Sequence, residues 1–133
     1  MQAWLCDNPI GVQALRWTEM PTPEPGPGQL RIRIHAASMN FPDLLTVQNK
    51  YQVKPPLPFV PGSEFSGSVD ALGEGVTGFA VGDRVATIGV TGGFATHACV
   101  AAQAVMRPSS RDSWISCQPS HAVSWPMGRP PWC

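Results

Sequence analysis

The chain has 133 residues, a mass of 14.3 kDa, no net charge and a pI of about 6.8, and its hydrophobic fraction of 43% and charged fraction of 14% are those of a single globular domain. A neutral surface gives no reason to expect a nucleic-acid or membrane-surface partner, and no apolar run approaches the roughly 18 residues of a membrane span. The N-terminal residues show no secretory signal, so the sequence predicts a cytoplasmic protein.

A proline-rich loop and an alternating strand are the first clear elements. Pro21 to Gly28 offer few backbone donors, which predicts an extended loop. Residues 29–37 alternate apolar and polar side chains, which is the period of a half-buried strand. The side chains expected to face the core are Leu30, Ile32, Ile34 and Ala36.

The elements that follow are short. A helix is predicted over Pro42–Gln48, because proline suits the first helical turn and Asp43 interacts favourably with the N-terminal end of the helix dipole. Strands are predicted at 65–72, 84–88 and 94–100. Short, closely spaced strands with Gly/Pro turns indicate a small barrel or sandwich, so the predicted fold class is mainly β with one short helix.

The composition changes at Arg107. Residues 107–133 contain three of the five tryptophans, five prolines, six serines, a single acid and no lysine, and they show neither a helical nor a strand period. We therefore expect residues 1–106 to form one domain and residues 107–133 an irregular tail, disordered or translated out of frame. A shifted frame of codons for residues 125–133 is able to encode Ala-Tyr-Gly, which favours a frameshifted or truncated gene product over a complete small protein.

The four cysteines lie far apart in the sequence. They are Cys6, Cys99, Cys117 and Cys133, without the paired spacing of a zinc knuckle or a disulfide framework. Scattered thiols in a cytoplasmic chain are usually reduced and structural. The cysteine pattern therefore predicts neither a disulfide nor a metal site.

Five short motifs follow one another along residues 1–106. They are PEPGPGQ (23–29), AASMNFPD (36–43), PFVPGSEFSG (58–67), VGDRV (81–85) and GGFA (92–95). In this order and spacing they resemble the N-terminal, GroES-like domain of the medium-chain dehydrogenase/reductase superfamily, within it the quinone oxidoreductase branch. The resemblance covers residues 1–106 and implies a GroES-like, partly open barrel.

The resemblance bears on metal binding at two positions. Zinc-dependent alcohol dehydrogenases of the superfamily have cysteine where this chain has Asn40 and histidine where it has Ser63. A carboxamide and a hydroxyl are poor zinc ligands. Alternation places His97 and Cys99 on one strand face, with no third ligand beside them in the pattern. We therefore expect a zinc-independent protein.

The same resemblance indicates two candidate catalytic residues that contact the substrate. A quinone or enone that accepts hydride develops negative charge on a carbonyl oxygen, which hydrogen-bond donors stabilise. Asn40 supplies an amide and Tyr51 a hydroxyl, and both match polar positions of the substrate cleft in similar quinone reductases. Structural roles stay open, since Asn40 could cap the predicted helix and Tyr51 could cover the end of the barrel. Glu64 is expected near the cleft or in a structural salt bridge.

No cofactor site is expected in this chain. Residues 73–78 fit the pattern G-x-G-x-x-G, but a dinucleotide loop must open a helix, because the pyrophosphate docks on the helix N-terminus. A second turn at Gly82 and Asp83 follows closely, which predicts a hairpin connection. The cofactor domain that the family places after the barrel needs roughly 100 residues or more, and we expect this chain to lack it.

The resemblance implies the substrate-side domain of an NADPH-dependent quinone or enone oxidoreductase, present here as a fragment that is inactive by itself. NADPH and a quinone, enone or enoyl thioester are the implied small-molecule partners of the full-length protein, which in this family is often a homodimer. Two alternatives stay open: a non-catalytic small barrel that binds partners or oligomerises, and an inactive truncated gene product.

Overall fold

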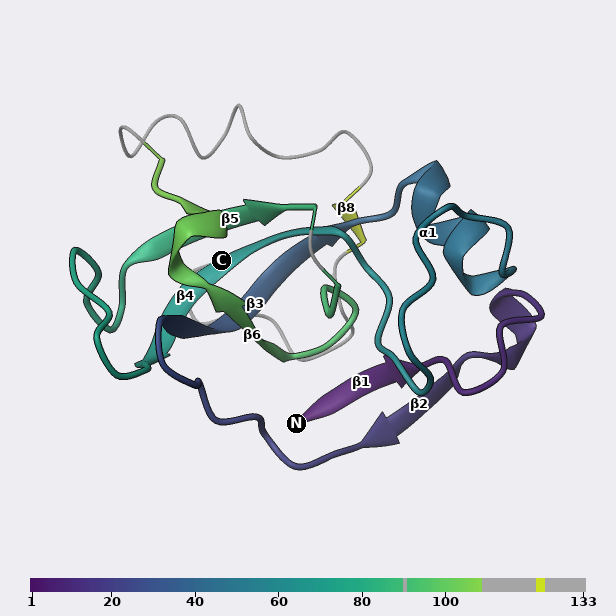
Figure 1. Ribbon diagram of the computed structural model, residues 1–133, viewed down its shortest axis with the longest axis horizontal. Helices are drawn as coiled ribbons and strands as arrows, with labels where there is room; N and C mark the ends of the chain where they lie inside the picture. Colours follow the sequence, from purple (N-terminus) through teal and green to yellow (C-terminus); the bar gives the residue numbers. More distant parts are fainter. Residues whose placement is uncertain (90, 109–121, 124–133) are drawn as a thin grey trace.

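The computed structural model describes residues 1–89, 91–108 and 122–123. The strands are β1 (Gln2–Leu5), β2 (Arg16–Glu19), β3 (Gln29–Ser38), β4 (Glu64–Leu72), β5 (Arg84–Ile88), β6 (His97–Ala101), β7 (Val105–Met106) and β8 (Ala122–Val123) (Figure 1). The helical elements are α1 (Phe41–Val47) and two 3-10 turns, η1 (Val12–Ala14) and η2 (Ala102–Ala104).

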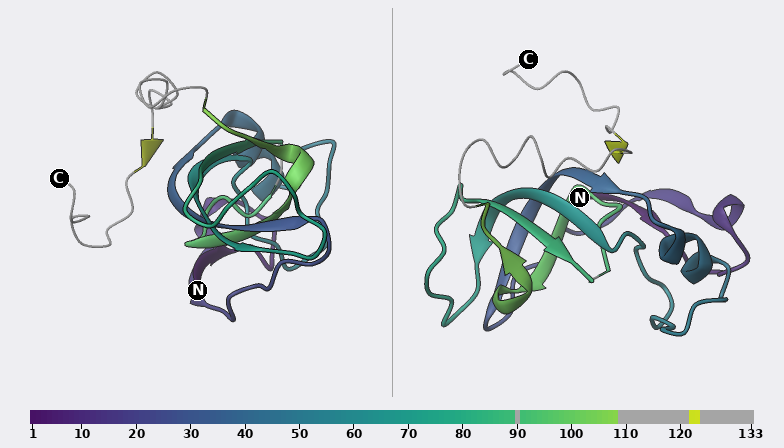
Figure 2. Two further views of the ribbon diagram at one scale, coloured as in Figure 1. Left: turned by 90° about the vertical axis from the view of Figure 1, so that its left-hand side faces the viewer. Right: turned by 90° about the horizontal axis from the view of Figure 1, so that it is seen from above.

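Antiparallel pairing builds almost the whole body. β6, β3, β4, β5 and β7 form one sheet in that order, and β8 pairs with the end of β3. The left view of Figure 2 shows this sheet curling around a common interior. The mainly β, partly open barrel with one short helix is therefore confirmed. The predicted tail lies outside the described residues, except for its first two residues and β8.

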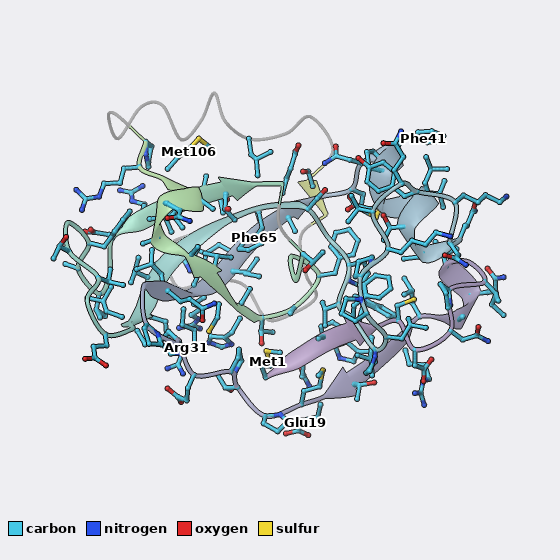
Figure 3. All side chains as sticks on the ribbon, viewed as in Figure 1. Met1, Glu19, Arg31, Phe41, Phe65 and Met106 are labelled. Atoms are coloured by element: carbon cyan, nitrogen blue, oxygen red, sulfur yellow. The ribbon has the colours of Figure 1, made fainter. Side chains whose placement is uncertain are left out.

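The curled sheet encloses the hydrophobic core. The core side chains are Leu30, Ile32, Ile34, Ala37, Phe65, Val69, Val85, Ala98 and Val100. Phe65 lies inside the curled sheet, whereas Phe41 stands exposed at the start of α1 (Figure 3). Burying a side chain such as Val, Leu, Ile or Phe contributes roughly 1.5–3 kcal/mol relative to leaving it exposed, so this cluster is the main source of stability.

The predicted alternation of β3 holds only as far as Ile34. Beyond it the pairing with β4 shifts register between Ile34 and Ala36. Ala36, predicted to face the core, is consequently only half-buried, and Ala37 and Ser38 are buried together in its place. A one-residue shift reverses the face of every later side chain, and here it brings Ala37 rather than Ala36 into the core.

The helix and one strand begin at residues other than those predicted. α1 begins at Phe41 and ends at Val47, one residue ahead of the prediction at each end. β6 begins at His97 rather than Phe94, because the residues between them pair with β1, where an isolated antiparallel bridge joins Ala95 to Ala3.

The hairpin of β1 and β2 was not predicted from the sequence. Trp4 on β1 stands opposite Trp17 on β2, and their ring centroids are 5.4 Å apart at an interplanar angle of 57°. The Trp4 N–H donates to the Phe94 carbonyl at 2.9 Å. This hairpin therefore connects the segment before β6 with the region around α1.

Gly67 of β4 is packed so closely that no side chain fits. A Cβ at this position would lie 2.0 Å from the carbonyl oxygen of Arg33 on β3. Overpacking costs about 1–3 kcal/mol, occasionally more. Gly67→Ala should therefore lower the free energy of unfolding by about 1–3 kcal/mol or more. Chemical denaturation followed by tryptophan fluorescence measures the change.

The matched control is Gly26→Ala. Its Cβ would meet only the end of the flexible Gln29 side chain, at 3.3 Å. This change should alter stability by no more than about 0.5 kcal/mol. Equal losses in the two variants would contradict the close approach of β3 and β4 at Gly67.

Candidate functional site

Asn40 stands at the start of α1, between β3 and the helix. It occupies the N-cap position with extended backbone, and its main-chain N–H donates to Asp43 Oδ2 at 2.9 Å. The Asn40 side chain faces the Asp43 N–H in a capping box, and its Nδ2 donates to Ser38 Oγ at 3.2 Å. Asn40 thus caps the helix, and its amide also joins a polar group on β3.

Two serine–carboxylate pairs surround Asn40. Ser38 Oγ donates to Glu64 Oε2, and Ser63 Oγ donates to Asp43 Oδ1, each at 2.9 Å. Ser38 is 2% exposed and Asp43 7%, and buried polar groups of this kind are stable only when their hydrogen bonds are made. Glu64, which the sequence places near the cleft or in a salt bridge, accepts this hydrogen bond and has no ion pair within the described part of the chain.

An apolar cleft of about 610 Å³ opens beside this group. It is lined by Trp4, Val12, Leu15, Ala37, Met39, Asn40, Phe41, Asp43, Leu44, Val47 and Phe94. Both Asp43 oxygens already accept hydrogen bonds, whereas the Asn40 amide is a polar group of the described lining with an N–H left for a ligand. The rim is apolar and exposed, with Phe41 70%, Met39 61% and Val12 57% accessible.

Two glycines hold one wall of the cleft against the segment before β4. Gly93 N–H donates to the Gly62 carbonyl, and Phe94 N–H to the Pro61 carbonyl, both at 2.9 Å. A Cβ on Gly62 would lie 2.7 Å from the Phe94 backbone nitrogen, and Gly62 has a φ of 99°, which favours glycine. Phe94 is thereby fixed directly against the chain that continues into Ser63.

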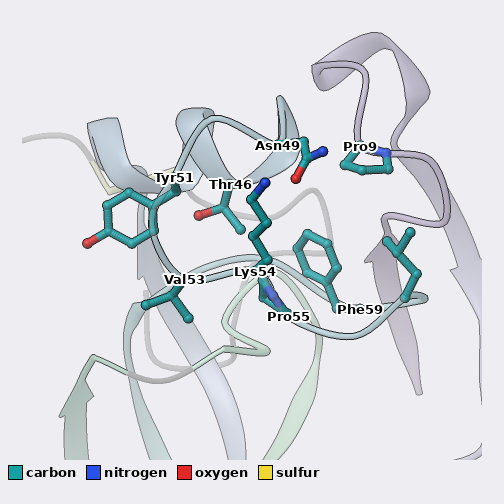
Figure 4. Close-up of a pocket in the computed structure, with 9 residues that line it drawn as sticks. Pro9, Thr46, Asn49, Tyr51, Val53, Lys54, Pro55 and Phe59 are labelled. Atoms are coloured by element: carbon teal, nitrogen blue, oxygen red, sulfur yellow. The ribbon is translucent and has the colours of Figure 1, made fainter.

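Tyr51, the other predicted site residue, lines a different cavity. This hollow of about 310 Å³ is also lined by Thr46, Asn49 and Lys54. Figure 4 shows the Lys54 side chain extending toward Asn49 and the Tyr51 hydroxyl directed away from both. α1 has seven residues and lies between Tyr51 and Asn40 in the chain, a length of about 10 Å at 1.5 Å per residue. The structure therefore places the two side chains in separate cavities, so they do not face a common ligand position.

His97 and Cys99 share the outer face of β6, as the alternation predicts, and each has its own partner. Asp70 Oδ2 is 4.0 Å from His97 Nε2 but accepts a hydrogen bond from Arg31 Nε at 2.6 Å. Cys99 Sγ donates to the Pro23 carbonyl at 3.6 Å. Burial lowers the pKa of His97 and raises the pKa of the Cys99 thiol. Across residues 1–89 and 91–108, no group of three or more His, Cys, Asp or Glu side chains is placed to hold a metal ion.

The G-x-G-x-x-G segment at residues 73–78 lies in a hairpin connection. It joins β4 to the antiparallel β5, whose Arg84 stands opposite Ser68. Asp83 accepts a hydrogen bond from the Ala80 N–H at 3.0 Å and so closes the second turn, as expected. A strand rather than a helix follows this segment, and a dinucleotide loop requires a helix.

We expect the purified chain to contain no stoichiometric zinc. The hydroxyl hydrogen of Ser63 is committed to Asp43, and the amide of Asn40 bonds to Ser38, so neither position offers the thiolate or imidazole that zinc prefers. Elemental analysis of the chain after growth with added zinc measures this. About one zinc per chain, lost on His97→Ala or Cys99→Ala, would show that the outer face of β6 binds metal.

The chain is similar to several known proteins. A curated relative, the quinone oxidoreductase-like protein 2 homolog of Nematostella vectensis, is 38% identical over 105 residues, which cover 79% of this chain and 28% of that protein. The crystal structure of the human synaptic vesicle membrane protein VAT-1 homolog-like protein superposes with a TM-score of 0.77 and 36% identity, covering 82% of this chain and 36% of that one. A mycobacterial protein solved in complex with NADPH gives a TM-score of 0.75 and 32% identity, covering 84% and 34%.

The chain spans less than a third of the length of the curated relative, so the match concerns its N-terminal barrel. The family described as the alcohol dehydrogenase GroES-like domain matches residues 26–110, which is more than half of the chain. These residues include β3, α1, β4, β5 and β6, and thus both serine–carboxylate pairs. This protein therefore belongs to the alcohol dehydrogenase GroES-like domain family, within the medium-chain dehydrogenase/reductase oxidoreductases.

Proposed function

We propose that this domain is the substrate side of a zinc-independent, NADPH-dependent quinone or enone oxidoreductase of the cytoplasm. The observation that supports this proposal best is the amide of Asn40 in a cleft whose walls are mostly apolar. A quinone or enone is a largely apolar molecule that gains negative charge on one carbonyl oxygen when it accepts hydride. A fixed N–H donor in apolar surroundings stabilises such a charge more than the same donor does in water.

The charges around the cleft favour a neutral substrate. Among the described residues that line the cleft there is no lysine, arginine or histidine. The carboxylate of Asp43 belongs to this lining, and that of Glu64 lies behind Ser38. A ligand with a carboxylate or phosphate at its reacting end would meet like charge without a cation to balance it. Neutral quinones and enones therefore suit this end of the cleft better than anionic compounds.

The comparisons support the chemical class. One relative is named a quinone oxidoreductase-like protein, and one structure of similar fold contains NADPH. NADPH supplies hydride when bound, but the described residues carry no dinucleotide loop, so we assign them no step in its binding or oxidation. We propose that the longer protein binds NADPH through another part and is a homodimer, as its resemblance implies. Within the described residues, no helix is long and apolar enough to cross a membrane.

Tyr51 has a secondary place in the proposal. Because it lines the smaller cavity at the far end of α1, it would contact a part of the substrate remote from the carbonyl at Asn40. The apolar walls near Phe94 and Val47 exclude water from the carbonyl, and Asn40 donates to it.

The exposed rim also favours a second candidate function, a non-catalytic module that binds a protein partner. Phe41, Met39 and Val12 are each more than half exposed around one hollow, and contiguous exposed apolar surface often marks an interface. Sedimentation of the chain at increasing concentration distinguishes the candidates. Concentration-dependent association that Phe41→Ser abolishes would favour the module, whereas the reductase proposal needs no such association.

The reductase proposal predicts that the chain alone binds a quinone but not NADPH. Titration of ¹⁵N-labelled chain with 1,4-naphthoquinone should shift the backbone amide signals of Asn40, Phe41 and Leu44, and NADPH should leave the spectrum unchanged. Asn40→Ala should weaken quinone binding about fivefold or more, because a typical hydrogen bond contributes about 1 kcal/mol and 1.4 kcal/mol corresponds to tenfold.

Tyr51→Phe is the matched control, since it removes a hydroxyl from the other cavity. It should change naphthoquinone binding less than Asn40→Ala. Shifts confined to Lys54 and Asn49 would place the quinone in the smaller cavity and contradict the role of Asn40. Micromolar binding of NADPH would contradict the assignment of this chain to the substrate side.

A further inference from the structure

The hydrogen bonds behind Asn40 run in one direction. Glu64 Oε2 accepts from the Ser38 hydroxyl at 2.9 Å, and Ser38 Oγ accepts from Asn40 Nδ2 at 3.2 Å. An ionised carboxylate only accepts hydrogen bonds, and a serine hydroxyl has one hydrogen to donate. Once that hydrogen is committed to Glu64, Ser38 has only lone pairs to offer to Asn40.

This direction decides which way the Asn40 carboxamide is turned. A carboxamide can rotate by half a turn, which exchanges its oxygen and its nitrogen at almost the same positions. With Ser38 limited to accepting, the nitrogen must face Ser38, because the oxygen would stand against another acceptor. The burial of Ser38, at 2% exposure, keeps water from taking the place of either partner.

We propose that Ser38 and Glu64 are positioning residues for Asn40, which fix its amide so that a ligand in the cleft always meets the same N–H donor. The inference rests on the proposed function, in which that donor binds a substrate carbonyl. Among the described residues no protein group accepts from the second N–H of Asn40, and the carboxamide also faces the Asp43 N–H in a capping box. Without Ser38, only this capping-box contact would oppose the reversed orientation, in which the amide presents its oxygen to the substrate carbonyl, which is repulsive.

The role is one of orientation, not of acidity. When Ser38 donates its hydrogen to the Glu64 carboxylate, the serine oxygen becomes a better acceptor for the Asn40 N–H. This donation adds no positive charge to the Asn40 amide. Glu64→Gln therefore provides a sharp test. The glutamine amide could donate to Ser38, release the serine hydrogen toward Asn40 Oδ1 and so permit the reversed orientation that the carboxylate forbids.

The first readout is the pair of Asn40 side-chain N–H signals in the ¹⁵N-labelled chain. In the unmodified chain one of the two hydrogens should be shifted downfield and exchange slowly with water. Ser38→Ala should accelerate its exchange about fivefold, the factor that corresponds to the roughly 1 kcal/mol of a typical hydrogen bond. Glu64→Gln should bring the two signals closer together, and Ser38→Thr, which keeps the hydroxyl, should restore the original pattern.

Ser68→Ala is the matched control. It removes a half-exposed hydroxyl from the outer face of the same sheet, where Ser68 contacts His35 and not Asn40. It should leave the Asn40 signals unchanged. If Ser38→Ala unfolds the chain, Glu64→Gln and Ser38→Thr still decide the question. Unchanged Asn40 signals in a folded Ser38→Ala or Glu64→Gln variant would overturn the inference.

The second readout is binding of 1,4-naphthoquinone, which separates this inference from the proposed function. Ser38→Ala should weaken binding about as much as Asn40→Ala, and Ser38→Thr should restore it. If the unmodified chain binds no quinone while the Asn40 signals respond to Ser38→Ala, the proposed function fails. The inference that Ser38 and Glu64 orient the Asn40 amide then still stands. If quinone binds and Ser38→Ala leaves its affinity unchanged, positioning for this ligand is overturned and the proposed function survives.

Discussion

The hydrogen-bonded ladder between β3 and β4, with its change of register after Ile34, is the constraint on which the site depends. After the shift Ala37 packs in the core in place of Ala36, and Ser38 beside it is buried as well. Ser38 thereby reaches Glu64, which stands opposite it at the start of β4. Without this shift, the end of β3 would present a different side chain to the Asn40 amide.

The apolar core and the polar group are two consequences of the same pairing. Upstream of the shift, β3 contributes Leu30, Ile32 and Ile34 to the interior, and these side chains hold the sheet closed. Downstream of it, β3 adds Ala37 to the core and then enters α1 through Asn40, whose backbone N–H is held by Asp43. The rigidity that the amide needs is therefore supplied by strands rather than by a loop. The open rim on the other side of the cleft is free of such constraint.

Much of this fold could be predicted because its signals are local. The period of residues 29–34 predicts the buried face of β3, and Pro42 with Asp43 predicts a helix start to within one residue. The register shift could not be predicted, since it leaves no mark on the side-chain pattern. The β1–β2 hairpin was missed because strands of four residues are too short to show a period, and their tryptophans meet only after folding.

The sequence indicates which segment forms the site, but not which side chains bond to one another there. The motif around Asn40 indicated the residue, yet its partner Ser38 bonds to Glu64 across 26 positions of sequence, a distance that only the β3–β4 pairing closes. The resemblance places Tyr51 in the same cleft as Asn40, because both match polar positions of similar proteins. The structure separates them, since α1 carries the chain away from the cleft before Tyr51 is reached.

The contact between Gly62 and Gly93 limits how chains with this fold diverge. A side chain at Gly62 would move the backbone at Phe94, and with it both the wall of the cleft and the segment that carries Ser63. These two walls consequently change only as a unit, through coordinated substitutions. The rim side chains Met39 and Phe41 project into solvent and are free to vary one at a time. Under the proposed function, new substrate preferences are therefore most accessible to natural variation at the rim, while the amide behind it stays in place.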